Sequence, residues 1–541
     1  MKKSFILTFA VLVCSIAFLR ADDPKIKLTF GPEYELTKKH YPIAFVGDLN
    51  KGFVQIGYAY QKSVSLQKFS PTLKLQSEKI VDLKSMPKGF AFRQIVTWGS
   101  KYYWFFDVYD KKAEREHLFA QEIDLEKGEL KGTAKELLQC KRIGSYYKWD
   151  ISFSSDSNKM FLYVKFPNES RDDSKNYQEY GCWVFDKDMK SIWAEPSIKM
   201  PYTEKKMEVE DLQGDRDGNL LILARVFNDD TKKEIKDNAP NFHFEILKFS
   251  AGVKKPTSVP FKFEDKYVAQ VTLLEDLDGK IVCTGFYANQ DKNGKLKANS
   301  GKLDGSFFLR LDSKENKLVN VHKGFYEIPG EVFKMYEADK AQKKMDKKEE
   351  KGEDMSGYNM RLRKVIFGED GSLLVVGEEY YTRTVTYTSG NRMVTRTYYH
   401  YNDVIAQYID GSGNLSWTKK IPKKQTGVDT RLNLGFRILP CNGANYLFFF
   451  DNPKNLNPNP GDDVYPFGAG WGGVLMAVRL DKSGEMKKTK VFDVRESKDK
   501  VDFMDASRIG SNSLITIASE GVNPFTLMPK GASKICLVTV Q

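Results

Sequence analysis

Adjacent carboxylates near the end of a predicted strand, Glu378 and Glu379, are a pair that could act as a catalytic acid and base. Glycoside hydrolysis needs two carboxyl groups at a defined separation on either side of the scissile bond. The sequence does not supply that separation, and it contains many other acidic pairs. A carbohydrate-active hydrolase is therefore the alternative function, and no catalytic residue is assigned.

Two turns of the form Asp-x-Asp-Gly, at Asp215 and at Asp276, begin like calcium-binding loops. A calcium loop supplies six or more oxygen ligands, including a distal Glu at fixed spacing, and neither turn is followed by such ligands. The five histidines occur singly, and no zinc-binding, nucleophile-elbow or phosphate-binding motif is present. We therefore predict simple turns, no metal and no cofactor, and we favour a protein without catalytic activity.

Tyrosine and arginine gather in the segment from Glu378 to Asp403, where Thr, Tyr, Val and Arg alternate around the turn signal Thr388–Asn391. This pattern predicts a long hairpin. Exposed Tyr and Arg side chains anchor interfaces, and flat Tyr rings also stack on sugars. The alternative is an extended sheet edge whose rings cover neighbouring loops. The predicted binding residues of this segment are Tyr380, Tyr381, Arg383, Tyr387, Arg392, Arg396, Tyr398 and Tyr399.

Two further excursions contain candidate binding groups. The loop from Asp451 to Gly472 is rich in Asn, Pro and Gly, and it contributes Tyr465 and Trp471 to the predicted binding residues. Trp471 is expected either to line a pocket or to pack between sheets. A charged insertion at about residues 330–356 is predicted to be helical over Glu331–Lys351, as a solvated excursion or as a docking arm.

The elements that position these segments form a repeat that recurs about eight times. Each repeat has an apolar strand, a short Asp/Gly or Asn/Gly turn, a second apolar strand, a variable stretch and a third strand that ends in Asp or Ser. Clear copies begin at Leu212, Leu273 and Val365. A repeat of this length made only of strands predicts an all-β fold of the β-propeller type, since strands that are apolar on both faces belong between stacked sheets.

The two ends of the chain are expected to share one sheet. The last repeat stops after its third strand, whereas Ile26–Leu36 precedes the first repeat and matches the fourth strand Leu73–Leu83 in its residue pattern. We therefore predict that the N-terminal strand closes the last blade, which gives eight blades, with seven as the alternative. Residues 22–541 would then form a single propeller domain.

The longer connections fall between second and third strands, or between repeats. In an antiparallel four-stranded blade, both kinds of connection leave from the same face, while the tight turns occupy the other face. The hairpin, the charged insertion and the Asp451–Gly472 loop should therefore share one long-loop face. Loops held on a rigid scaffold are where binding residues concentrate.

The first 21 residues resemble a signal peptide, with Lys2 and Lys3 before an apolar run from Phe5 to Phe18. That run is too short to span a bilayer comfortably, and no later segment approaches 18 uninterrupted apolar residues. The formal net charge of +12 is spread among acidic residues without a basic stripe, which argues against nucleic-acid binding. Export to the periplasm or to the cell surface is the expected location.

Two short runs carry a resemblance to a known family. The segments Asp410–Trp417 and Asp188–Trp193 resemble the Gly-x-x-x-Trp repeat ending of quinoprotein-like propellers, in which a Trp of each blade docks against the next blade. The chain as a whole is also similar to uncharacterised exported β-propeller proteins of the Bacteroidetes type, on the residues Val375–Glu378, the Tyr-rich hairpin and the run Trp417–Gln425. That resemblance implies the fold and export, and no known activity.

The sequence therefore favours a non-catalytic exported scaffold that binds an envelope protein or a glycan through its long-loop face. The alternative, a carbohydrate-active hydrolase, would place its carboxylates at the mouth of the channel. The oligomeric state is not predicted.

Overall fold

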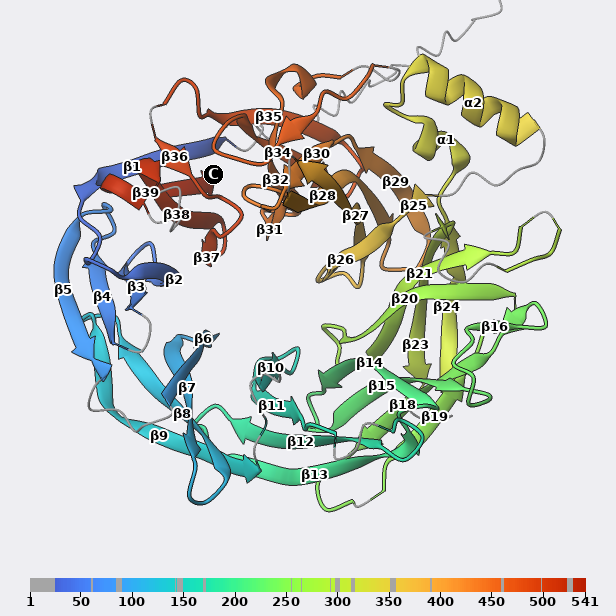
Figure 1. Cartoon of the computed structure of the whole chain (residues 1–541), viewed down its shortest axis with the longest axis horizontal. Helices are drawn as coiled ribbons and strands as arrows, with labels where there is room; N and C mark the ends of the chain where they lie inside the picture. The colour runs from blue at the N-terminus through green and yellow to red at the C-terminus, as the bar shows by residue number, and fades with distance from the viewer. Residues whose placement is uncertain are drawn as a thin grey trace, which may run out of the picture.

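The computed structural model describes residues 25–541, except for 60–61, 84–89, 142, 144–148, 169–171, 254, 264, 292, 297–301, 313–316, 351–356, 390–391, 459–461, 498 and 523–528. The predicted signal peptide lies outside the described residues. The described chain is all-β, with eight sheets of four or more strands that follow one another around a ring (Figure 1). Their strands pair antiparallel, except for the short pair Gln425–Val428 and Phe467–Gly468. The predicted propeller-type fold is therefore correct at the level of class and sheet order.

Within each sheet the first strand lies nearest the centre of the ring and the fourth lies at the rim (Figure 1). The first strands are β2 (Tyr41–Asp48), β6 (Phe90–Trp98), β10 (Trp149–Phe153), β14 (Met207–Gly214), β20 (Lys266–Glu275), β26 (Met360–Phe367), β31 (Arg437–Cys441) and, in two pieces, β36 (Lys500–Val501) with β37 (Ser507–Ile509). The second strands are β3 (Gly52–Ala59), β7 (Lys101–Asp110), β11 (Lys159–Lys165), β15 (Leu220–Phe227), β21 (Ile281–Asn289), β27 (Leu373–Ser389), β32 (Ala444–Asp451) and β38 (Ser513–Val522).

The third strands are β4 (Ser63–Phe69), β8 (Arg115–Asp124), β12 (Tyr177–Asp186), β18 (Phe242–Phe249), β23 (Gly305–Asp312), β28 (Arg392–Ile409), β34 (Val474–Asp481) and β39 (Pro529–Val540). The fourth strands are β5 (Leu75–Asp82), β9 (Glu129–Lys141), β13 (Ser191–Thr203), β19 (Thr257–Phe261), β24 (Lys317–Glu327), β29 (Leu415–Ile421), β35 (Met486–Asp493) and β1 (Ile26–Tyr34). Short additional elements are β16 (Ile235–Lys236), β17 (Ala239–Pro240), β22 (Lys302–Leu303), β25 (Gly357–Tyr358), β30 (Gln425–Val428), β33 (Phe467–Gly468), α1 (Gly330–Lys334), α2 (Asp339–Glu350) and the 3-10 turn Pro453–Asn455.

The core lies between neighbouring sheets. Every residue of β15 is buried, in keeping with its run Leu220–Phe227, which is apolar except for Arg225. One core cluster joins Phe161 and Val184 of the third sheet to Leu220 and Ile222 of the fourth. Apolar faces on both sides of each sheet therefore hold the ring together.

Tryptophans reinforce the contact between neighbouring sheets. Trp193 donates a hydrogen bond from Nε1 to the carbonyl oxygen of Gly218, 2.7 Å away in the next sheet, and Trp417 donates to that of Lys482 at 3.1 Å. Trp98 makes a third such bond, to Ser157 at 2.8 Å. The two tryptophans in the runs that resemble quinoprotein-like repeats therefore dock on the following sheet.

The two ends of the chain lie side by side in the last sheet. Strand β1 runs antiparallel to β39, with Ile26 opposite Val540 and Phe30 opposite Cys536. The backbone N–H of Gln541 also donates to the carbonyl of Lys25 at 3.0 Å. In Figure 1 this pairing joins the blue and red ends of the chain.

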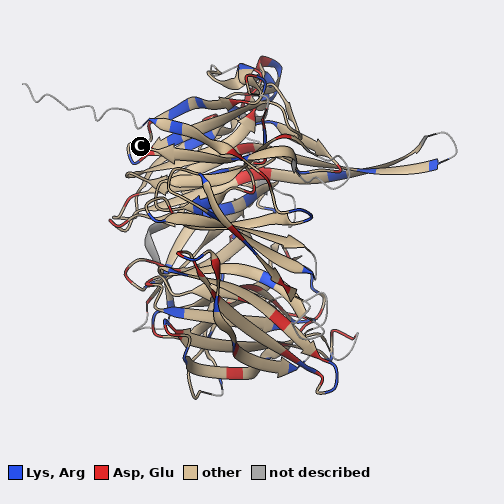
Figure 2. Cartoon of the chain, turned by 90° about the vertical axis from the view of Figure 1, so that its left-hand side faces the viewer, with Lys and Arg blue, Asp and Glu red and all other residues tan. Residues whose placement is uncertain are grey.

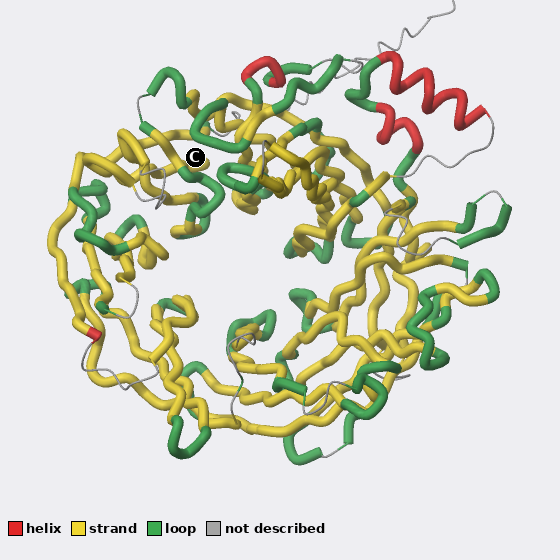
Figure 3. The backbone as a smooth tube through the Cα atoms, viewed as in Figure 1, coloured by secondary structure: helices red, strands yellow, loops and turns green. Residues whose placement is uncertain are grey.

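The charged insertion differs from the single helix expected over Glu331–Lys351. Two helices form, α1 and α2, and Tyr336 between them adopts a positive φ of 60°. The break lets α1 bury Val332 and Phe333 while the polar α2 turns back, with Lys334 Nζ 2.6 Å from Asp346 Oδ1. Both helices lie at the outer rim of the ring (Figure 3), and Lys351 lies outside the described residues.

The five cysteines among the described residues are all free thiols, and four of them are buried. Burial raises the pKa of Cys140 to about 12. Neither helix of the described chain has the length and apolar composition needed to cross a bilayer.

Candidate binding site on the hairpin and its base

The long hairpin forms as predicted, and it extends the sixth sheet. Strands β27 and β28 stay paired from Leu373 opposite Ile409 to Ser389 opposite Arg392. The outer part projects along the axis of the ring, well beyond the other strands (Figure 2). The residues at its tip, 390–391, lie outside the described residues.

The register gives the outer hairpin two different faces. On one face Thr386 lies opposite Thr395 and Thr384 opposite Thr397. The hydroxyls of the first pair are 3.0 Å apart and those of the second are 3.4 Å apart, so these threonines largely satisfy one another. The opposite face consists of Tyr381, Arg383, Val385, Tyr387, Arg392, Val394, Arg396, Tyr398 and His400.

Most of the predicted binding residues therefore share one face, which we call the Arg/Tyr face. Tyr387 is 45% exposed, and Arg383, Arg392 and Arg396 are exposed as well. Arg396 is anchored by Asp429, whose Oδ2 lies 2.6 Å from Nη1. Two of the predicted residues, Tyr380 and Tyr399, lie on the threonine face instead.

Aromatic rings and guanidinium groups stack where the hairpin leaves the body. Tyr380 and Tyr401 have ring centroids 4.7 Å apart, and the guanidinium of Arg363 lies 5.1 Å from the centroid of Tyr380. Arg431 lies 4.4 Å from the centroid of Tyr399 in the same manner. Cation–π contacts of this kind stabilise the packing at the base of the hairpin.

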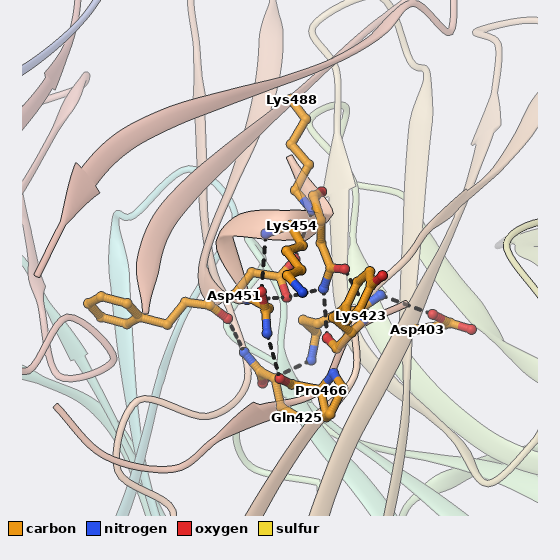
Figure 4. Close-up of polar contacts among 11 residues, drawn as sticks. Asp403, Lys423, Gln425, Asp451, Lys454, Pro466 and Lys488 are labelled. Carbon is orange, nitrogen blue, oxygen red and sulfur yellow. Dashed lines mark hydrogen bonds and ion pairs between the residues drawn. The ribbon is translucent and has the colours of Figure 1, made fainter. Parts of the chain in front are cut away.

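A buried ionic network lies under this aromatic layer. Lys423 Nζ donates to Glu378 Oε1 at 2.7 Å, to the carbonyl of Tyr401 at 3.0 Å and to Gln425 Oε1 at 3.1 Å. Arg363 donates to the other oxygen of Glu378 at 2.8 Å. Burial lowers the pKa of Lys423, although the charge of Glu378 opposes that shift. Figure 4 shows Lys423 beside Gln425 and Asp403.

The network continues into the seventh sheet and into the Asp451–Gly472 loop (Figure 4). Gln425 donates to the carbonyl of Phe450 at 2.7 Å. The buried carboxylate of Asp451 accepts from Lys488 Nζ and from Asn455 Nδ2, each at 2.8 Å. Asn455 in turn accepts from the backbone N–H of Tyr465, whose exposed ring lies under the ammonium of Lys454. These bonds join the described parts of the loop on either side of residues 459–461 to each other and to the seventh sheet.

A second charged group lies on the opposite side of the same sheet, at a bulge between Glu378 and Tyr380. Lys420 Nζ is 2.9 Å from Asp403 Oδ2 and 2.9 Å from Glu337 Oε1, which comes from the helical insertion. Burial, together with the negative charge of Asp403, raises the pKa of Glu379 to about 7. The insertion and the hairpin, separate excursions in the sequence, therefore meet at one lysine.

The structure separates the two carboxylates that the sequence pairs. Glu378 is buried and forms ion pairs with Lys423 and Arg363. Glu379 lies on the other side of the sheet, where the negative charge of Asp403 contributes to its raised pKa. Trp471 lies apart from the hairpin, in the wall of a cavity near the centre of the ring. Among the described residues, no group of three or more His, Cys, Asp or Glu side chains could hold a metal ion.

Several residues of the site were not predicted from the sequence. Lys420 and Lys423 stand in a basic run that looks solvent-exposed, and their acidic partners are far away in the chain. The one available signal was Pro422 between them, which ends β29 and lets the chain turn toward β30. Met393, 78% exposed near the hairpin tip, was also missed.

Comparison with known proteins gave similarities of fold alone. No protein family and no curated protein matches this sequence. The WD40 domain of SCAP from fission yeast is 9% identical with a TM-score of 0.37, and the similarity covers 95% of this chain and 94% of that domain. The quinohemoprotein alcohol dehydrogenase ADHIIG from Pseudomonas putida HK5 is 10% identical with a TM-score of 0.39, over 95% of this chain and 76% of that enzyme.

A protein of unknown function from Dyadobacter fermentans is 10% identical with a TM-score of 0.29, over 73% of this chain and 95% of that protein. At this level of similarity the activities of these proteins say nothing about the present chain. The propeller-type fold follows from the ring of four-stranded sheets itself.

Proposed function

We propose that this protein is an exported, eight-bladed β-propeller scaffold that binds an envelope protein or a glycan through its long-loop face. Eight sheets in the described chain and the β1–β39 pairing support the blade count and the closure by the N-terminal strand. The resemblance of residues 1–21 to a signal peptide supports export, and the similarity to Bacteroidetes-type propellers supports an envelope location.

The Arg/Tyr face of the projecting hairpin is the observation that carries the proposal. Between Tyr380 and Asn402 the sequence has three arginines and no acidic residue, so this arm presents positive charge together with flat aromatic rings. Tyr and Arg contribute strongly to protein interfaces because they combine large contact area with directional hydrogen bonds. The threonine face is a weaker candidate, since its hydroxyls already bond to one another.

The base of the hairpin supports the same proposal. An arm that binds a partner loses less entropy when it is already held in position. The Lys423 network on one side and the Lys420 group on the other hold the strands where they leave the body. Positive charge on the arm favours a partner with acidic groups.

Capture from the envelope fraction of the source cells tests the proposal. In the test variant, a two-residue Asn-Gly turn replaces Val385–Arg396. The turn then connects Thr384 to Thr397, which lies opposite it in the register. This change leaves the base and the β28–β30 pairing intact. We expect the variant to lose the partner that the wild type captures.

A comparison of the two faces provides the matched control. Arg383→Gln with Arg396→Gln changes the Arg/Tyr face, whereas Thr384→Val with Thr386→Val changes the other face of the same strands. We expect the first pair to reduce capture at least fivefold and the second pair to leave it unchanged. Identical partners for the wild type and the shortened variant would exclude the hairpin as the contact arm.

A further inference from the structure

The innermost strand of the last sheet is interrupted, unlike that of every other sheet in the described chain. Strands β36 and β37 both pair with β38, and residues 502–506 bulge out between them. A cavity of ≈ 540 Å³ lies beside this interruption, where the last sheet meets the first. Its size falls within the range of about 300–1,000 Å³ typical of small-molecule sites.

The cavity combines aromatic walls with groups that form strong hydrogen bonds. The aromatic and charged residues of the lining that bear on ligand binding are Tyr41, Arg437, Trp471, Lys500, Asp502 and Asp505. Tyr41 is 44% exposed, and Trp471 is partly exposed. Two acidic and two basic residues give a lining that is balanced in charge, which favours a neutral ligand over an anion or a cation.

Arg437 supplies hydrogen-bond donors to this lining. Its Nε atom is buried, but the side chain as a whole is only partly buried and lines the cavity. Guanidinium N–H groups form strong hydrogen bonds to oxygen acceptors. Burial, together with the nearby negative charge of Asp505, raises the pKa of Asp502 to about 6, although Arg437 opposes that shift. Asp502 can therefore serve either as a donor or as an acceptor near neutral pH.

The buried side chain of Asn433 links two segments that carry lining residues of the cavity. Its side-chain nitrogen donates to the carbonyls of Val501 at 3.0 Å and of Gly470 at 3.1 Å, and its oxygen accepts from the N–H of Phe503 at 3.1 Å. A single buried side chain therefore ties the interrupted strand to the loop that carries Trp471. The backbone of the interruption is also bonded elsewhere, since the Thr516 hydroxyl donates to the carbonyl of Asp502 at 2.7 Å and the N–H of Ala506 donates to that of Phe503 at 3.1 Å.

The position of the cavity matches the face that carries the hairpin. Tyr41 is the first residue of β2, Trp471 lies three residues before the start of β34, and Asp502 and Asp505 precede β37. In each antiparallel sheet these positions lie at the end from which the long connections leave. The cavity and the hairpin are therefore accessible to the same partner.

We propose that this cavity binds a neutral saccharide, with Tyr41 and Trp471 stacking on a sugar ring and Arg437, Asp502 and Asp505 bonding its hydroxyls. Aromatic rings match the apolar C–H faces of a pyranose, and charged planar groups form the strongest bonds to hydroxyl pairs. The inference rests on the proposed function and adds to it a site for a neutral glycan on the long-loop face, separate from the positively charged hairpin.

Titration with a panel of neutral oligosaccharides tests the proposal. The probes are malto-, cello-, xylo- and chito-oligosaccharides of two to six sugar units. Isothermal titration calorimetry on the full chain measures their binding. We expect at least one probe to bind saturably. Trp471→Ala and Asp505→Asn should each weaken that binding at least tenfold. Asp505 is exposed, so its variant should fold normally.

Tyr177→Ala is the matched control for the aromatic wall. Tyr177 is 40% exposed at the start of β12, remote from the cavity, and its removal should change affinity less than twofold. Binding by no probe, or an unchanged affinity in both cavity variants, would overturn the inference. The shortened hairpin should still bind the saccharide. Suppose that the shortened variant loses the captured envelope partner, while the cavity variants bind the saccharide as tightly as the wild type. The cavity inference then fails and the proposed scaffold function stands.

Discussion

The ammonium of Lys423 lies 2.7 Å from a carboxylate oxygen of Glu378, and both side chains are buried at the base of the hairpin. The pair is not an isolated surface contact, since Arg363, Gln425 and the carbonyl of Tyr401 complete its hydrogen bonds. Through Gln425, which donates to the carbonyl of Phe450 at 2.7 Å, this network links the sixth sheet to the seventh where the hairpin begins.

We expect Lys423→Met to destabilise the protein by roughly 3–5 kcal/mol, because it leaves Glu378 buried with only Arg363 as its charged partner. The double variant Lys423→Met/Glu378→Gln should recover more than half of that loss. Urea unfolding measures both effects. A single variant within about 0.5 kcal/mol of wild type would show that water reaches this pair freely.

Glu379→Gln should stabilise the protein only at high pH. The pKa of Glu379 is raised from 4.5 to about 7 in the folded chain, so the native state holds a proton that the unfolded state has released. Wild-type stability therefore falls as the pH rises from 4.5 through 7, and Gln removes that loss. The difference between variant and wild type should approach about 3 kcal/mol at pH 8 and vanish below pH 4.5. A difference independent of pH would contradict this assignment.

Trp193 provides a test of the docking between sheets. Trp193→Phe removes the hydrogen bond to Gly218 and keeps most of the packing, so we expect a loss of about 1 kcal/mol. Trp193→Ala also removes the partly buried ring and should cost about 2–3 kcal/mol. Thermal unfolding followed by circular dichroism compares the two variants. Equal losses would mean that the ring contributes no packing energy.

Removal of β1 should leave the edge of β39 unpaired. We expect a chain that begins at Glu35 to have a lower Tm and to form oligomers in size-exclusion chromatography, because an exposed strand edge pairs with other chains. A chain that begins at Lys25 keeps the strand and serves as the control. A monomeric, equally stable chain without β1 would show that the last sheet does not need its fourth strand.

The strands could be predicted because burial between sheets leaves a strong pattern in the sequence. The run Leu220–Val226 is apolar at every position except Arg225, and β15 extends from Leu220 to Phe227. The Asp-x-Asp-Gly turns also follow from local chemistry, since Asp276 Oδ1 accepts the N–H groups of Asp278 and Lys280 within its own turn. Such interactions involve residues close in the chain.

The charged groups could not be predicted because their partners are distant in the chain. Lys423 pairs with Glu378 across 45 residues, and Lys420 pairs with Glu337 across 83. The interruption of the last sheet depends on Asn433, which is 70 residues from Phe503. The break between α1 and α2 likewise accompanies the burial of Phe333 against other elements. Intrinsic helix propensity contains no information about such tertiary contacts.

The pairing of Ile26 with Val540 has a consequence for how the molecule is made. Since β39 follows every other strand of the ring in the sequence, the sheet that contains β1 stays incomplete until the chain has been synthesised through Val540. Contacts this distant along a chain form slowly. The ring is therefore expected to reach its native state late, after the strands between its two ends are already in place.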